Sequence, residues 1–173
     1  MKNRVKSKKA QQLFGMPFTV IFSIFLIAIF LAVAIYVIMH FWGIKQCAEI
    51  GLFTNDFQEE VDSAWKAASY DSGDKPFTSV LPDKIKYVCF ADVKKPATGN
   101  SAEKEIFEKI KENVDDDKDN LYFYPFLCDV KSTKILHVDM ESLTNPYCIP
   151  VVNGKISINL KKDYFDSLVK VSK

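Results

Sequence analysis

Four cysteines are the side chains in this 173-residue sequence whose type and spacing are best suited to chemistry. They are Cys47, Cys89, Cys128 and Cys148, separated by 42, 39 and 20 residues. Zinc sites usually place two ligands two to four residues apart, so this spacing argues against a metal centre. An even number of cysteines favours two disulfides in oxidising surroundings, and buried free cysteines are the alternative. Three pairings exist; the shortest loop favours Cys128–Cys148, which leaves Cys47–Cys89.

Two other groups of polar residues resemble reactive sites. His137 lies in the apolar segment 135–138, which we expect to be a strand, and there a structural role is favoured over a catalytic one. The acidic run 115–119 has alternate carboxylates like the start of an EF-hand loop. Its sixth position is Asn120 and its twelfth is Phe126, so we expect a solvated loop instead. Phosphate-binding, nucleophile and metal-helix motifs are also missing from the sequence, and we expect no enzymatic activity, cofactor or metal.

An apolar run of 26 residues, 17–42, contains His40 as its only ionisable side chain. A helix of roughly 20 apolar residues crosses the hydrocarbon core of a bilayer, so the run predicts a transmembrane helix. His40 and its aromatic neighbours Phe41 and Trp42 suit the membrane interface. Cleavage of a signal peptide after Ala34 is disfavoured, because apolar residues follow at once and the run exceeds the usual 7–15 residues.

The basic residues are distributed unevenly around this run. Residues 1–16 carry five of the 23 Lys and Arg and no acid, whereas only Lys45 lies close to the other end. The positive-inside rule therefore predicts a single-pass protein of the cell membrane, with residues 1–16 cytoplasmic and residues 43–173 outside. After residue 42 the chain has 18 Lys, no Arg and 22 acidic residues, a net charge of −4. This composition argues against a nucleic-acid partner.

The first part of the outer segment has helical spacing. Asn55 and Gln58 resemble a capping box, and apolar residues follow at helical intervals: Phe57, Val61, Ala64, Trp65 and Ala68. Ile44, Ala48 and Leu52 keep the same spacing through 43–54, which predicts that the membrane helix continues into this amphipathic helix, with a bend at Gly51. We expect Trp65 to anchor this face, so that Trp65→Ala costs roughly 3–5 kcal/mol.

The remaining segments predict an α+β domain with a small antiparallel sheet. Strands are expected at 85–92, 121–128, 134–138, 148–152 and 155–160, and helices at 101–114 and 163–171. Ser101, followed by Lys104 and Glu105, is the expected cap of the first of these helices. Turns are indicated at 71–76 and, most strongly, at Asn153-Gly154, a pair typical of a β-hairpin.

The N-terminal stretch resembles type IV pilin-like proteins of the archaeal class. Lys9, Ala10 and Gln11 match the family's processing pattern, in which cleavage falls just before a Gln, and the apolar helix follows. That family carries a Glu at the fifth mature position, where this chain has Gly15. The resemblance implies a helix with an amphipathic second half, a β-rich outer domain and assembly into a surface filament.

The outer segment, with CFAD, YPF and NPYCIPV, otherwise resembles uncharacterised archaeal single-pass membrane proteins, and that resemblance implies no activity. Two functions are therefore expected. The first is a membrane-anchored component of the cell envelope that binds a partner or serves a structural role. The second is a pilin-like subunit that self-assembles through its helix. In both, the lipid bilayer is the first partner.

Overall fold

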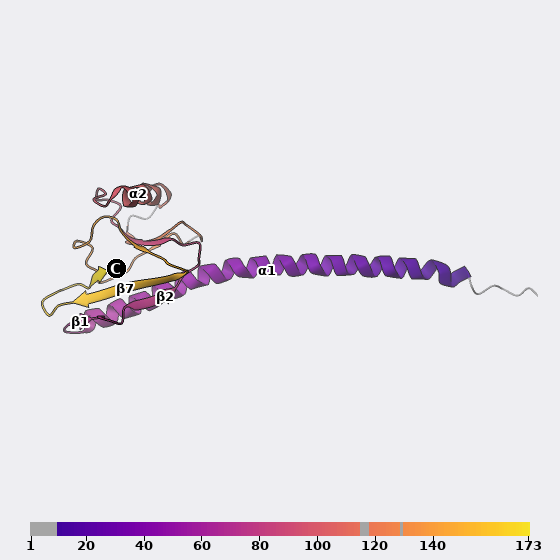
Figure 1. The fold of residues 1–173 in the computed structure, drawn as a ribbon, viewed down its shortest axis with the longest axis horizontal. Helices are drawn as coiled ribbons and strands as arrows, with labels where there is room; N and C mark the ends of the chain where they lie inside the picture. The colour runs from indigo at the N-terminus through magenta and orange to yellow at the C-terminus, as the bar shows by residue number, and fades with distance from the viewer. Residues whose placement is uncertain (1–9, 115–117, 129) are drawn as a thin grey trace, which may run out of the picture. The chain divides into compact units, whose positions relative to one another are not determined.

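The structure is a computed structural model that describes residues 10–114, 118–128 and 130–173. Its elements follow the order α1-β1-β2-β3-α2-β4-β5-β6-β7-β8, and the named strands pair antiparallel, so the fold is α+β as the sequence predicts (Figure 1). The chain forms two compact units, Met1–Gly43 and Ile44–Lys173. Most of the basic N-terminal stretch and the acidic residues 115–117 lie outside the described residues.

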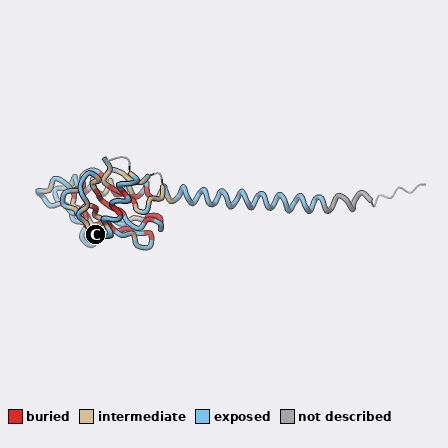
Figure 2. The backbone as a smooth tube through the Cα atoms, turned by 90° about the horizontal axis from the view of Figure 1, so that it is seen from above, coloured by how far each residue is buried: buried red, intermediate tan, exposed pale blue. Residues whose placement is uncertain are grey.

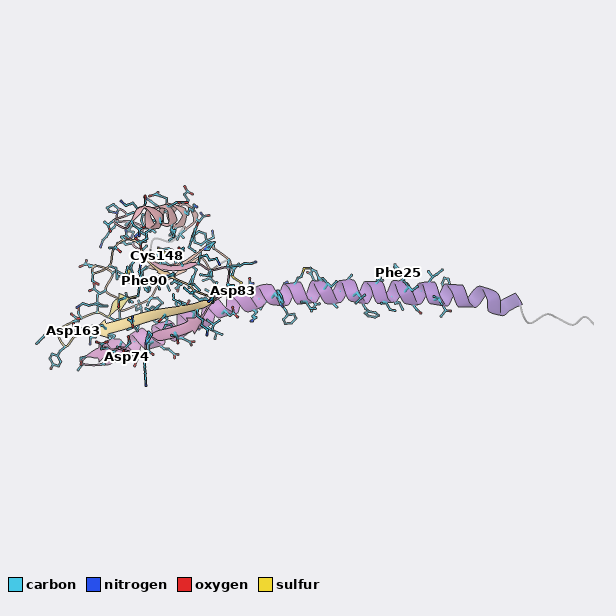
Figure 3. The ribbon with its side chains drawn as sticks, viewed as in Figure 1. Phe25, Asp74, Asp83, Phe90, Cys148 and Asp163 are labelled. Carbon is cyan, nitrogen blue, oxygen red and sulfur yellow. A yellow bond between two sulfur atoms is a disulfide. The ribbon has the colours of Figure 1, made fainter. Side chains whose placement is uncertain are left out.

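Helix α1 (Ala10–Lys66) is uninterrupted over 57 residues. All side chains from 18 to 42 are exposed, among them Phe25, labelled in Figure 3. Within the described residues, α1 is the one helix long and apolar enough to cross a membrane, judged by length and composition. The predicted continuation past Trp42 is confirmed. The expected helix start at Asn55 is wrong, because no proline interrupts 43–54 and each of its two glycines costs a helix only about 1 kcal/mol.

The part of α1 in the second unit buries one face in the domain core. The fully buried side chains share helical spacing: Ile50, Phe53, Phe57, Val61 and Ala64. The predicted face at 57, 61 and 64 is confirmed. Ile44 and Leu52 are exposed at 53% and 61%, so the N-terminal part of the expected stripe is wrong. The buried stripe passes through Ile50 and Phe53 instead.

The first sheet has the order β5-β4-β3-β6. Its strands are β3 (Tyr87–Phe90), β4 (Leu121–Tyr124), β5 (Ser132–Thr133) and β6 (Tyr147–Pro150). Successive strand residues point to opposite faces, and both faces here are covered. Val88 and Phe90 enter the core that contains α1, whereas Cys89 between them enters a second core.

The second sheet is built around β7 (Lys155–Lys162), which pairs with β1 (Tyr70–Asp71), β2 (Phe77–Val80) and β8 (Lys170–Ser172). The Asn153-Gly154 turn before β7 is confirmed, with φ of 51° and 69°. A Cβ on Gly154 would lie 2.6 Å from Oδ1 of Asp83 and 3.1 Å from the carbonyl oxygen of Leu81, and the positive φ also favours glycine there. The turn does not close a long hairpin, because β6 and β7 belong to different sheets. It is closed by an isolated bridge between Val152 and Lys155.

Helix α2 (Ser101–Asn113) covers the face of the first sheet opposite α1 (Figure 1). The buried residues gather inside the domain (Figure 2). Phe90 and Cys148, labelled in Figure 3, lie between α2 and α1. The N-cap is Asn100 rather than Ser101. Oδ1 of Asn100 accepts from the backbone N–H of Glu103 at 2.9 Å, and Oε2 of Glu103 accepts from the N–H of Asn100 at 3.0 Å. This capping box fixes the first turn of α2.

Two expected elements are wrong. The segment 163–171 is a turn followed by β8, because Val171 pairs with Leu160 of β7 and this tertiary pairing overrides the helical spacing. The expected strand 134–138 is irregular, with a single bridge between Val138 and Val169. The expected strands 85–92, 121–128, 148–152 and 155–160 are confirmed with shifted bounds, and the turn at 71–76 separates β1 from β2.

Candidate functional site

The four cysteines form two disulfides, but in a different pairing from the one that loop length favours. Cys89 is bonded to Cys148, and Cys47 to Cys128, with Cα–Cα distances of 4.0 and 5.8 Å. The predicted pairs Cys128–Cys148 and Cys47–Cys89 are therefore wrong. Strand register decides the outcome: Cys89 of β3 lies directly opposite Cys148 of β6. Cys128 then lies after β4, within reach of Cys47 on α1.

The Cys47–Cys128 disulfide fastens α1 to the domain. Cys47 lies one turn before Ile50, where the buried face of the helix begins. Its partner Cys128 follows β4 at a sequence separation of 81. The bridge therefore ties the first turns of the packed part of α1 to the first sheet.

The residues of the pilin-like processing pattern have no described geometry beyond the helix backbone. Lys9 lies outside the described residues, Ala10 is the first residue of α1, and Gln11 follows it in the helix. Asp115, Asp116 and Asp117 of the EF-hand-like run also lie outside. Across the described ranges, no group of three or more His, Cys, Asp or Glu side chains is placed to hold a metal ion.

Four side chains meet at the C-terminal end of α1, and we call them the His137 cluster: Gln58, Asp62, Trp65 and His137. Oδ1 of Asp62 accepts from Nε2 of Gln58 at 2.8 Å and lies 2.9 Å from Nδ1 of His137. The Trp65 and His137 rings are stacked, with centroids 3.8 Å apart and planes 5° from parallel. The side chains of Asp62 and His137 are 33% and 29% exposed, so the cluster lies at the surface.

The backbone around His137 is held by further hydrogen bonds. His137 has a φ of 66°, in the left-handed region that few non-glycine residues adopt. The N–H of Leu136 donates to Oε1 of Gln58, and the N–H of Val169 donates to the His137 carbonyl, both at 2.8 Å. Nε1 of Trp65 donates to the carbonyl of Ser167 at 3.0 Å. The cluster thus fastens two loops, 134–139 and 163–169, to α1.

In an Asp–His pair the aspartate can orient the histidine as a general base. Here the contacts of the His137 imidazole favour a structural role instead. Asp62 holds Nδ1, and the indole of Trp65 covers one ring face. The arrangement fits the structural interpretation of His137. Sequence spacing gives no signal for it, because His137 lies 75 residues from Asp62.

Trp65 is not the buried anchor that the sequence predicts. Its side chain is 37% exposed, and it contributes through the ring stack and one hydrogen bond. Because cavity costs scale with buried volume, Trp65→Ala is expected to cost less than truncation of the fully buried Phe53 or Phe57.

The hydrogen bond from His137 is the main cause that holds the pKa of Asp62 below its ordinary value of 3.8. A carboxyl with a lowered folded-state pKa stabilises the fold above its unfolded pKa, and this contribution is lost as pH falls through the folded value. Asp62→Asn is therefore expected to lower the free energy of unfolding by about 1 kcal/mol at neutral pH. The difference from the wild type should shrink as pH drops below 3.8.

Urea titrations of the full chain in detergent at several pH values measure this difference. Asp56→Asn, on an exposed position of the same helix, is the matched control and should show no comparable loss. If the difference in free energy of unfolding between the wild type and Asp62→Asn does not change with pH, even well below 3.8, the assignment of the Asp62 carboxylate to the cluster is contradicted.

An ordered turn beside the cluster presents two exposed aromatic side chains. Tyr164 and Phe165 are 71% and 94% exposed, with ring centroids 5.2 Å apart. The turn is held by a hydrogen bond from the N–H of Asp166 to the carbonyl of Asp163 at 3.0 Å, and by an ion pair of Asp166 with Lys170 at 2.7 Å. Single exposed apolar residues are common on protein surfaces, so this pair alone assigns no function to the turn.

Comparisons of the chain with models of protein families, with curated proteins and with solved structures found no match. The function proposed for the chain therefore rests on its own residues and geometry.

Proposed function

We propose that this chain is a single-pass, membrane-anchored protein whose extracytoplasmic domain is a non-catalytic binding or structural component of the cell envelope. The observation that carries the proposal is the first part of α1, where every side chain from 18 to 42 is exposed and the composition is apolar. In water such a surface is unfavourable, whereas a bilayer offers it an apolar solvent.

Charge and disulfides support the orientation. Five basic residues precede the apolar run 17–42 and only Lys45 follows it closely, which favours a cytoplasmic N-terminus. Both disulfides lie in the unit Ile44–Lys173, and disulfides persist in oxidising compartments outside the cytoplasm. The charge distribution and the disulfides thus independently favour the extracytoplasmic side of the membrane for residues 43–173.

Membrane anchoring is tested by alkaline extraction of membranes from cells that express the full chain. We expect the wild-type chain to stay in the membrane pellet. Leu26→Arg combined with Phe30→Arg should release it, because each arginine near the centre of a membrane helix costs about 2.5–3.5 kcal/mol of insertion free energy. Phe165→Arg, at an exposed position of the domain, is the control and should remain in the pellet. Release of the wild-type chain would contradict the proposal.

The alternative is a pilin-like subunit that assembles into a surface filament through its helix. The uninterrupted course of α1 from Ala10 to Lys66, with its second part packed on antiparallel sheets, is the observation that favours it. Intact-mass analysis of the mature chain separates the two functions. A chain that begins at Gln11 supports the pilin-like subunit, and a chain that begins at Met1 supports the anchor.

A further inference from the structure

We propose that an open groove between α2 and the loop 92–97 binds a phosphate-bearing anion with several negative charges. The groove has a volume of about 570 Å³. Four lysines line it: Lys94, Lys95, Lys104 and Lys111. This volume lies within the range of roughly 300–1,000 Å³ that is typical of sites for small molecules. The assignment rests on the proposed binding role of the domain and names the class of its ligand.

The local charge of the groove is opposite to that of the domain. Four ammonium groups line it together with one carboxylate, that of Glu108. The Asp92 carboxylate also lies 3.8 Å from Nζ of Lys95, which leaves the groove positive. Residues 43–173 as a whole carry a net charge of −4. The lysines are therefore concentrated in the groove, although the domain as a whole has a net negative charge. Such a concave positive surface attracts anions.

The loop side of the groove is held by hydrogen bonds to one half-buried residue, Asn145. Its Oδ1 accepts from the N–H of Asp92 at 2.9 Å, and its Nδ2 donates to the carbonyls of Asp92, Lys95 and Pro96 at 2.9, 3.2 and 3.2 Å. Its own N–H donates to Oγ1 of Thr98 at 2.9 Å. These bonds fix the backbone that carries two of the lysines, so binding does not have to order the loop.

The helix side is equally fixed. Lys104 and Lys111 are seven residues apart, which places them on one face of α2 about two turns from each other. Phe107 lies between them, is only 2% exposed and lines the groove. Its burial against the first sheet and the capping box at Asn100 hold α2 in place. The lysine stems can lie along this apolar floor while their ammonium groups stay at the rim.

The chemistry of the four cations favours phosphate. A lysine ammonium is a compact charge with three donors that adapts to a tetrahedral group, whereas planar bidentate recognition requires arginine, which this domain lacks. Two pairs of lysines on opposite walls suit a ligand with more than one phosphate charge. A lipid headgroup and a soluble polyphosphate both offer this chemistry.

The test uses the full chain in an uncharged detergent, with inorganic tripolyphosphate as the probe in isothermal titration calorimetry. We expect saturable one-to-one binding that weakens as salt rises. Lys104→Ala combined with Lys111→Ala should weaken binding at least tenfold. Lys84→Ala combined with Lys155→Ala removes the same charge from exposed positions outside the groove and should change affinity less than twofold.

The outcomes separate this proposal from the membrane anchor. Equal losses of tripolyphosphate affinity in the two double variants, or no binding to the wild type, would overturn the proposed anion site. Neither result would change the outcome of alkaline extraction. Urea titrations must first show that both variants unfold like the wild type; if Lys104→Ala with Lys111→Ala is destabilised, Lys94→Ala with Lys95→Ala replaces it. Displacement of tripolyphosphate by a short-chain cardiolipin, whose headgroup carries two phosphates, supports a lipid headgroup as the ligand, and lack of displacement supports a soluble phosphate.

Discussion

Phe57→Ala is expected to lower the free energy of unfolding of the domain by about 3–5 kcal/mol. Phe57 is 0% exposed and lies where α1 meets both sheets. Its ring centroid is 5.7 Å from that of Phe53, 5.2 Å from Phe77 of β2 and 5.9 Å from Phe90 of β3. Truncation removes contacts to three elements at once and leaves a cavity that the surrounding rings cannot fill by small movements.

Urea titration of the detergent-solubilised full chain, followed by near-ultraviolet circular dichroism, measures this loss. Leu52→Ala is the matched control, because Leu52 lies on the same helix and is 61% exposed. Its effect should stay within about 0.5 kcal/mol, as is usual for surface substitutions. Similar effects of the two substitutions would mean that this part of α1 does not belong to the domain core.

Removal of the Cys47–Cys128 disulfide is expected to cost about 2–4 kcal/mol. The bridge joins residues separated by 81 positions, and without it the unfolded chain gains the entropy of a long open loop. The measurement compares urea titrations of the wild type and of Cys47→Ala combined with Cys128→Ala. The second disulfide stays intact in this variant, so the loss belongs to one bridge.

The pairing itself is tested by digestion of the denatured, unreduced chain under conditions that block thiol exchange. Mass spectrometry should find peptides that join Cys47 to Cys128 and Cys89 to Cys148, and no free thiol. A peptide that joins Cys128 to Cys148 would contradict the structure and support the pairing with the shortest loop.

Local patterns in the sequence are sufficient for the elements that depend on local interactions. The apolar run of α1, the helix at 101–113 and the Asn153-Gly154 turn follow from composition, spacing and turn chemistry. The segment after Lys162 has equally clear helical spacing, yet it forms a turn and β8. There Val169 and Val171 are buried by pairing with distant residues, while Tyr164 and Phe165 stay exposed.

The features that link distant segments could not be predicted from spacing. The disulfide pattern depends on the register of β3 and β6, which sets Cys89 against Cys148. The His137 cluster depends on a left-handed residue far from α1 in sequence. The lysine groove likewise depends on Asn145, about 50 residues further along the chain, which holds the loop that lines the groove opposite α2. Each of these sites exists only once the sheets have formed.

We propose that the apolar part of α1 anchors the chain in a membrane with the disulfide-bonded domain outside. The chain carries its own reporters, since Lys2, Lys6, Lys8 and Lys9 precede the apolar run 17–42 and 18 lysines follow it. An amine-reactive reagent that cannot cross membranes is applied to intact and to permeabilised cells, and the labelled lysines are identified by mass spectrometry. We expect labelling after residue 42 alone in intact cells and on both sides after permeabilisation. Labelling of the N-terminal lysines with protection of the domain in intact cells would contradict the account.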